Sequence, residues 1–142
     1  MKTTNAKGLP HLLFSAALLA GGAGLASAAD VTVKLTGNEE VPAVTTAATG
    51  TGKITIKDDM SVSGAIRTTG VEGTMAHIHM AEPGKNGPPV ISLEKKGTDE
   101  WVVPAGSKLT EDQYKSFKAG NLYVNVHSAA HKGGEIRTQL KP

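Results

Sequence analysis

Four of the five histidines in this 142-residue chain lie in two short stretches. His77 and His79 have the spacing H-x-H, and His127 and His131 have the spacing H-x3-H. Neutral imidazole is a favoured ligand of copper and zinc. The chain has no cysteine, so a metal site would use imidazole, carboxylate or thioether ligands. These observations predict one metal site built from all four histidines, with copper as the favoured metal and zinc as the alternative.

The fifth histidine falls in an N-terminal segment with the three parts of an export signal. Two lysines form a basic region, an apolar stretch follows over residues 12–25, and Ala26-Ser27-Ala28 matches an A-x-A cleavage site. The apolar stretch is shorter than the ~20 residues of a membrane-spanning helix. We therefore expect a cleavable signal peptide over residues 1–28 and a periplasmic or secreted single domain over residues 29–142, with no membrane anchor after cleavage.

Composition excludes several other classes of protein. Once the two lysines of the predicted signal peptide are removed, basic and acidic residues are equal in number. A neutral chain with interspersed charges argues against a nucleic-acid partner and against a polybasic membrane surface. The lack of cysteine excludes a disulfide framework. The predicted partner is a metal ion, and no segment identifies a protein partner.

Short segments rich in Val, Ile and Thr alternate with clusters of Gly, Pro, Asn and Asp, which is the pattern of antiparallel strands and turns. We expect about eight strands, near residues 31–36, 50–57, 60–68, 74–80, 89–94, 100–103, 121–128 and 134–140. One segment differs, because Thr110 and Gln113 form a capping box and Gly120 follows as a stop, so a short helix is expected over about 110–119. The predicted fold class is all-β, an antiparallel Greek-key sandwich or flattened barrel.

The positions of the histidines along these strands predict the face to which each side chain points. Side chains alternate between the two faces of a strand, so His77 and His79 share one face and the apolar residues around Ile78 share the other. The same rule turns Val126 inward and His127 outward. We expect three imidazoles on the outer face of the barrel, under the turn-rich loop that follows the first histidine pair.

His131 and two methionines are further candidate ligands near the predicted site. The loop after His127 is expected to fold back and return the imidazole of His131 to the site. Met75 and Met80 flank the first histidine pair, and core packing is favoured over thioether ligation because alternation points Met80 inward. The alternative for the histidines themselves is a solvated polar surface with no metal.

Two long motifs resemble the CHRD domain, first described in chordin and common in exported bacterial proteins. They are AHIHMAEPGKNGPPV over residues 76–90 and GNLYVNVHSAAHKGGEIRTQL over residues 120–140, and L-x-G-x-x-E-V-P over residues 35–42 adds to them. The resemblance runs over nearly all of residues 31–141. It implies a β fold and an exported single-domain form, and it carries no activity by itself.

A second resemblance concerns chemistry. The HIH and VNVH segments are similar to the strands that supply copper ligands in Cu,Zn superoxide dismutases, which are also Greek-key barrels. This resemblance implies that His77, His79 and His127 are copper ligands and that Arg137 is a substrate-guiding residue. No histidine between Met80 and His127 matches a bridging or zinc ligand, so the implied enzyme is a copper-only, superoxide dismutase-like oxidoreductase.

Three functions are therefore open. The first is an exported copper-binding protein, and the second is an enzyme of redox chemistry on a small oxygen species. The third is a structural or protein-interaction module whose histidines only order loops and whose exposed strand edges bind another protein.

Overall fold

The computed structural model describes residues 27–142. Most of the predicted signal peptide over residues 1–28 lies outside the described residues, so its cleavage stays a prediction. Among residues 27–142, no helix is long and apolar enough to cross a membrane.

The described chain contains nine strands, one short 3-10 helix and one α-helix. The strands are β1 (Ala28–Thr36), β2 (Thr49–Lys57), β3 (Val62–Thr69), β4 (Gly73–Met80), β5 (Pro89–Ser92), β6 (Glu94–Lys96), β7 (Glu100–Val102), β8 (Leu122–Ser128) and β9 (Ile136–Leu140). The 3-10 helix is η1 (Gly37–Glu39) and the α-helix is α1 (Glu111–Lys118). Each predicted strand is present, but the one expected over residues 89–94 is divided between β5 and β6.

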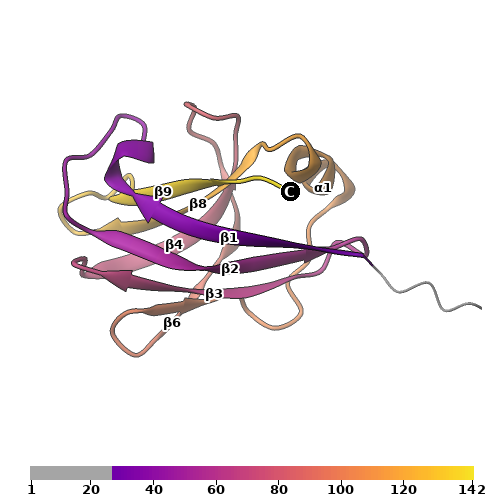
Figure 1. Cartoon of the computed structure of the whole chain (residues 1–142), viewed down its shortest axis with the longest axis horizontal. Helices are drawn as coiled ribbons and strands as arrows, with labels where there is room; N and C mark the ends of the chain where they lie inside the picture. The colour runs from indigo at the N-terminus through magenta and orange to yellow at the C-terminus, as the bar shows by residue number, and fades with distance from the viewer. Residues whose placement is uncertain (1–26) are drawn as a thin grey trace, which may run out of the picture.

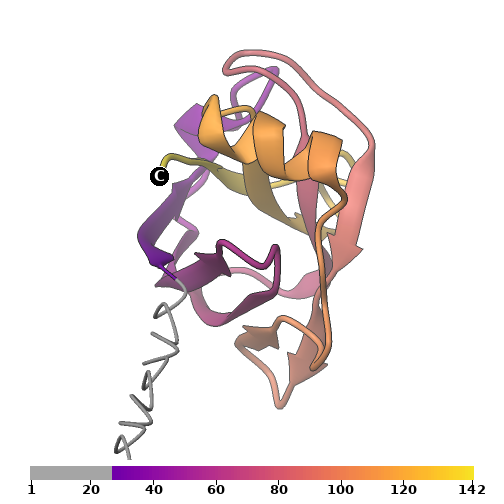
Figure 2. The ribbon, with the colours of Figure 1, turned by 90° about the vertical axis from the view of Figure 1, so that its right-hand side faces the viewer.

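The strands form one antiparallel sheet in the order β5-β4-β8-β9-β1-β2-β3-β7-β6. The sheet curls into a nearly closed barrel, as Figures 1 and 2 show from two directions. Its two end strands, β5 and β6, are consecutive in the chain and are joined through Leu93, whose N–H donates to the carbonyl of Ala76 on β4 at 2.9 Å. This junction explains the divided strand, because the chain stops pairing with β4 there and begins to pair with β7. The predicted flattened, all-β barrel is confirmed.

The two end strands are short and differ in character from the rest. β5 begins with Pro89, which has no backbone N–H to offer to a further strand. β6 consists of Glu94, Lys95 and Lys96, all exposed.

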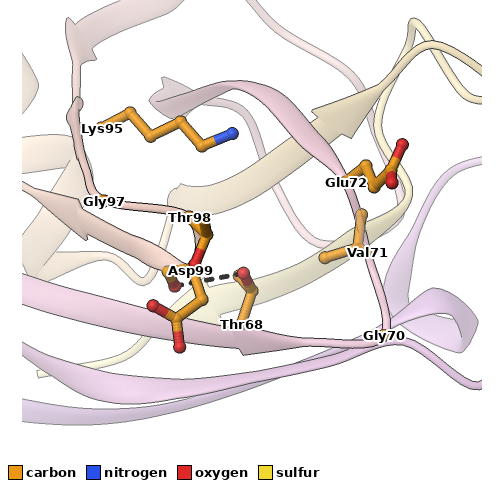
Figure 3. A pocket seen from close by; sticks show the side chains of 8 residues that line it. All are labelled: Thr68, Gly70, Val71, Glu72, Lys95, Gly97, Thr98 and Asp99. Atoms are coloured by element: carbon orange, nitrogen blue, oxygen red, sulfur yellow. Dashed lines mark hydrogen bonds between the residues drawn. The ribbon is translucent and has the colours of Figure 1, made fainter.

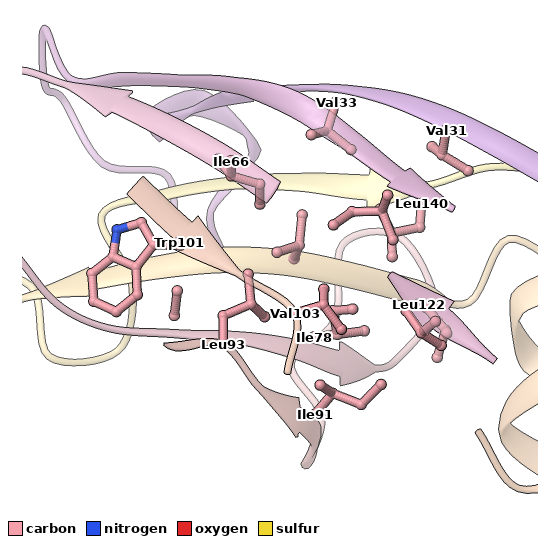
Figure 4. Close-up of a cluster of buried hydrophobic side chains, with 14 of the residues drawn as sticks. Val31, Val33, Ile66, Ile78, Ile91, Leu93, Trp101, Val103, Leu122 and Leu140 are labelled. Atoms are coloured by element: carbon pink, nitrogen blue, oxygen red, sulfur yellow. The ribbon is translucent and has the colours of Figure 1, made fainter. Parts of the chain in front are cut away.

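The core fills the barrel interior mainly with aliphatic side chains, together with Trp101 and Phe117. Figure 4 shows Val31 and Val33 of β1 facing Ile78 of β4 across this interior, with Trp101 of β7 at one end. The exposed fraction of these four side chains is 7% or less. Alternation along each strand thus places the predicted apolar residues inside.

Helix α1 lies at the end of the barrel where β1 begins (Figure 1). The predicted capping box is confirmed, since the Thr110 hydroxyl accepts from the Gln113 N–H and the Gln113 side chain accepts from the Thr110 N–H. Phe117 is fully buried in the core, and Tyr114 packs against it.

The first prediction concerns the inner face of β4. Ile78 is fully buried between the two histidines of its strand, so Ile78→Ala leaves a cavity and is expected to lower the free energy of unfolding by about 2–5 kcal/mol. Denaturant unfolding monitored by circular dichroism measures this change. Thr32→Ala, on the exposed face of β1, is the control and should change it by less than about 1 kcal/mol. Equal effects of the two substitutions would contradict the placement of Ile78.

Candidate metal centre

Strands β4 and β8 pair directly and carry the three candidate ligands. Their antiparallel register places Met75 opposite His127, His77 opposite Asn125 and His79 opposite Tyr123. The residues between them on β4, Ala76 and Ile78, are in the core with 1% or less of their surface exposed. The prediction that His77, His79 and His127 share the outer face of the barrel is therefore confirmed.

This outer face is nonetheless covered. His79 and His127 have only 8% and 7% of their surface exposed, and His77 is half-buried. Two loops account for the burial, one over residues 81–88 and one over residues 129–135, because each places a backbone carbonyl against an imidazole. The site is thus a buried polar layer on the outside of the sheet.

The three imidazoles converge. One ring nitrogen of each histidine lies within 4.8 Å of the corresponding nitrogens of the other two. His77 Nδ1 and His127 Nε2 are 3.0 Å apart. Copper and zinc bind imidazole nitrogen at about 2.0–2.1 Å, so two ligand nitrogens of a tetrahedral ion lie roughly 3.3 Å apart. The His77–His127 pair, hydrogen-bonded to each other in this structure, is close to that spacing, and the His79 nitrogen lies within 4.8 Å of both.

Backbone carbonyls determine which nitrogen of two rings is free. The Nδ1–H of His79 donates to the carbonyl of Gly87 at 2.9 Å, and the Nδ1–H of His127 donates to the carbonyl of Lys132 at 2.8 Å. A carbonyl only accepts, so each Nδ1 carries the hydrogen and each Nε2 presents a lone pair. Ring N–H groups of metal-binding histidines are held in this way.

One of these lone pairs forms no hydrogen bond of acceptable geometry, although the Asn125 side chain lies close enough to His79 to limit the lowering of its pKa by burial. His79 Nε2 is buried and forms no hydrogen bond. Buried polar atoms are nearly always partnered, and an unpartnered one needs an explanation. Its position in the converging group fits a bound cation, so the residues present are suited to a metal ion.

The protonation states agree with this fit. Burial is the main cause that lowers the pKa of His77 and of His79, and the neighbouring His127 lowers both pKa values further, while the hydrogen bond with the Gly87 carbonyl limits the lowering at His79. Neutral imidazole is the form that binds a metal. The site therefore keeps two of its rings in the ligand form near neutral pH.

The loop over residues 81–88 is held against His79 by steric and polar contacts. A Cβ at Gly87 would overlap the carbonyl oxygen of Met80, so only glycine fits this approach. The Gly87 N–H donates to the Tyr123 hydroxyl at 3.2 Å. Tyr123 itself stacks on His79, with ring planes 1° from parallel and centroids 4.8 Å apart.

Arg137 braces the same loop from β9. Its guanidinium donates to Asn86 Oδ1 at 3.0 Å and to the carbonyl of Lys85 at 2.7 Å. Its Cζ lies 3.4 Å from the centroid of Tyr123, and β8 separates β9 from β4, so Tyr123 lies between Arg137 and His79. Arg137 is 1% exposed and acts in this structure as a positioning residue. Its predicted role as a substrate guide stays a prediction.

His131 is not part of the converging group, which contains three histidines and not four. Its N–H donates to the Ser128 hydroxyl at 3.1 Å, and its carbonyl accepts from the N–H groups of Ser128 and Gly134. His131 instead lines a different pocket, of about 360 Å³, together with Glu40 and Pro42. The loop folds back as expected, but what it returns to His127 is the Lys132 carbonyl.

Glu40 is a residue near the site that sequence reasoning missed. It is 5% exposed, and one of its carboxyl oxygens is buried without a hydrogen bond. Burial raises the pKa of Glu40 to about 7, and the charge of Arg137 and a contact with Asn125 limit the rise. Its position as the glutamate of the L-x-G-x-x-E-V-P segment was the sequence signal that could have identified it.

A second and larger pocket lies elsewhere on the barrel. It has a volume of about 530 Å³, with Lys95 and Glu72 on opposite sides (Figure 3). The Lys95 amine donates to the carbonyl of Gly73 at 2.7 Å and lies over the Trp101 ring. None of the three converging histidines lines this pocket.

Comparison with known proteins adds one finding. The family model described as the CHRD domain matches residues 31–140, a range that includes all three converging histidines and Arg137. No curated protein and no solved structure matches the chain.

The buried carboxyl of Glu40 should make the stability of the protein depend on pH. The pKa of Glu40 is about 7 in the folded chain against an ordinary value of 4.5, so the folded state binds more protons between these values. The stability that this proton contributes is complete below about pH 4.5 and is lost as the pH rises through about 7. Glu40→Gln carries no titratable proton at this position, so its free energy of unfolding should not show this loss. Relative to wild type, that free energy should therefore rise by about 1 kcal/mol between about pH 6 and about pH 8.

Denaturant unfolding of the metal-free protein at these two pH values measures the difference. Glu39→Gln, at the exposed neighbouring residue, is the matched control. A constant offset between Glu40→Gln and wild type across the pH range would show that burial does not raise the pKa of this carboxyl.

Proposed function

This chain belongs to the CHRD domain family, and we propose that its function is to bind one copper ion through His77, His79 and His127 as an exported protein. The observation that carries the proposal is the buried, unpartnered Nε2 of His79 within a group of three converging ring nitrogens. Export rests on the predicted signal peptide.

The choice of metal follows from the ligands. The converging group consists of three imidazoles, with no carboxylate or thiolate among its members. Imidazole suits both copper and zinc, and for a given set of nitrogen ligands Cu²⁺ binds more tightly than Zn²⁺. Copper is therefore the proposed ion, and zinc is the alternative.

A second candidate function is superoxide dismutase-like redox activity. His77 is only half-buried, so the ligand group has an accessible side. Burial is the main cause of the lowered pKa of His79, and the charge of Arg137 adds to it, so this guanidinium would also favour an anion beside the ligands. Copper, when bound, would supply the one-electron chemistry that no side chain of the group supplies.

One observation supports the third possibility, an interaction module. His79 and His127 each hold a loop through a backbone carbonyl, which is what loop-ordering histidines would do. That role uses Nδ1 of each ring and leaves the buried Nε2 of His79 unexplained. Metal binding accounts for both nitrogens.

Copper titration tests the proposal. After removal of metal by a chelator, the protein is expected to bind one Cu²⁺ per chain in a calorimetric titration. Free copper at about 100 times the Kd should raise the free energy of unfolding by about 2.7 kcal/mol. His127→Ala removes a ligand nitrogen and should weaken binding at least about 100-fold, as loss of a ligand costs more than the 10- to 100-fold of its supporting hydrogen bonds.

His131→Ala is the matched control, because His131 belongs to the same loop region but lies outside the converging group. Its affinity for copper should stay within about threefold of wild type. Equal losses in the two variants, or no stoichiometric copper binding by wild type together with an unchanged Tm, would favour the interaction module instead.

The redox candidate has its own test. Copper-loaded protein, in the presence of a chelator that suppresses free copper, is expected to remove superoxide faster than the metal-free protein. The rate should fall as salt is added, since a steered anion is screened over a Debye length of about 10 Å at 0.1 M ionic strength. A rate equal to that of the metal-free protein rules out dismutation while leaving copper binding intact.

A further inference from the structure

One more group with a lone pair stands beside the three imidazoles. Met75 lies two residues before His77 on β4 and directly opposite His127 on β8. Side chains at this spacing and in this pairing share a face of the sheet. The thioether of Met75 is therefore on the outer face, next to the two histidines whose ring nitrogens are 3.0 Å apart.

Met75 also differs from the other methionines of the described chain. Met60 and Met80 pack against the hydrophobic core, whereas Met75 is 50% exposed and is the large hydrophobic side chain left exposed among residues 27–142. Met80 lies on the same strand but on the opposite face. Core packing, which explains the other two thioethers, does not explain this one.

The surroundings of the ligand group leave its Met75 side accessible. Tyr123 and the loop over residues 81–88 cover His79. At the other end, the half-buried His77 and the exposed Met75 adjoin each other. Directly opposed residues have Cβ atoms about 4.5–5.5 Å apart, and the three rotatable bonds of methionine let its sulfur reach a neighbouring ring.

We propose that the Sδ atom of Met75 is a fourth ligand that completes the site for Cu⁺. The inference rests on the proposed function and names the oxidation state that the site prefers. Thioether is a soft ligand that selects Cu⁺, whereas imidazole alone serves Cu⁺, Cu²⁺ and Zn²⁺. Met75 therefore adds affinity for reduced copper and little for Cu²⁺ or Zn²⁺.

Affinity measurements on two matched variants test this role. Met75→Leu and Met80→Leu remove one thioether each from opposite faces of β4 while conserving side-chain volume. Cu⁺ affinity is measured anaerobically, with ascorbate, by competition with bicinchoninate, and Cu²⁺ affinity by competition with glycine. Met75→Leu should weaken Cu⁺ binding by about tenfold or more and leave Cu²⁺ within about threefold, and Met80→Leu should leave both within about threefold.

X-ray absorption at the copper edge of the Cu⁺-loaded wild type gives an independent readout. A sulfur scatterer is expected in wild type and in Met80→Leu and is expected to be lost in Met75→Leu. Unchanged Cu⁺ affinity in Met75→Leu, or a wild-type spectrum with nitrogen scatterers only, overturns the inference and leaves the copper site standing. Failure of wild type to bind either oxidation state overturns both.

Discussion

The pairing of β4 with β8 in one fixed register is the constraint on which the site depends. A slip of one residue would send the histidines inward and bring Ile78 and Val124 to the outer face. Both of these residues are fully buried, and burying a side chain of this size contributes about 1.5–3 kcal/mol. The apolar face of the pair therefore determines where the imidazoles of the other face lie.

A layer of hydrogen bonds on the outer face completes what the register begins. Gly87 and Lys132 supply the carbonyls that orient two rings, and Arg137 holds the first of these loops through Asn86. Because the layer is buried, an unsatisfied group in it costs about 1–3 kcal/mol. The carbonyls of these two loops thus fix the orientation of two of the three rings.

Sequence reasoning succeeded where the determining interactions are local. Strand alternation predicted the face of His77, His79 and His127 correctly, and the capping box predicted α1. It failed for His131, because the turn from Ser128 to Gly134 depends on backbone contacts that its residue types do not specify.

The orienting carbonyls could not be predicted either, since every residue has one and only the folded loop selects Gly87 and Lys132. Glu40 was missed because its neighbours, Asn125 and Arg137, lie far from it in sequence.

The two end strands of the curled sheet also affect self-association. An exposed strand edge is a template for aggregation, and proline and lysine are common protections against it. With Pro89 at one end strand, Lys95 and Lys96 at the other, and Leu93 joining the two, the end strands of the barrel formed by residues 27–142 offer little edge on which copies of the chain could stack into fibrils.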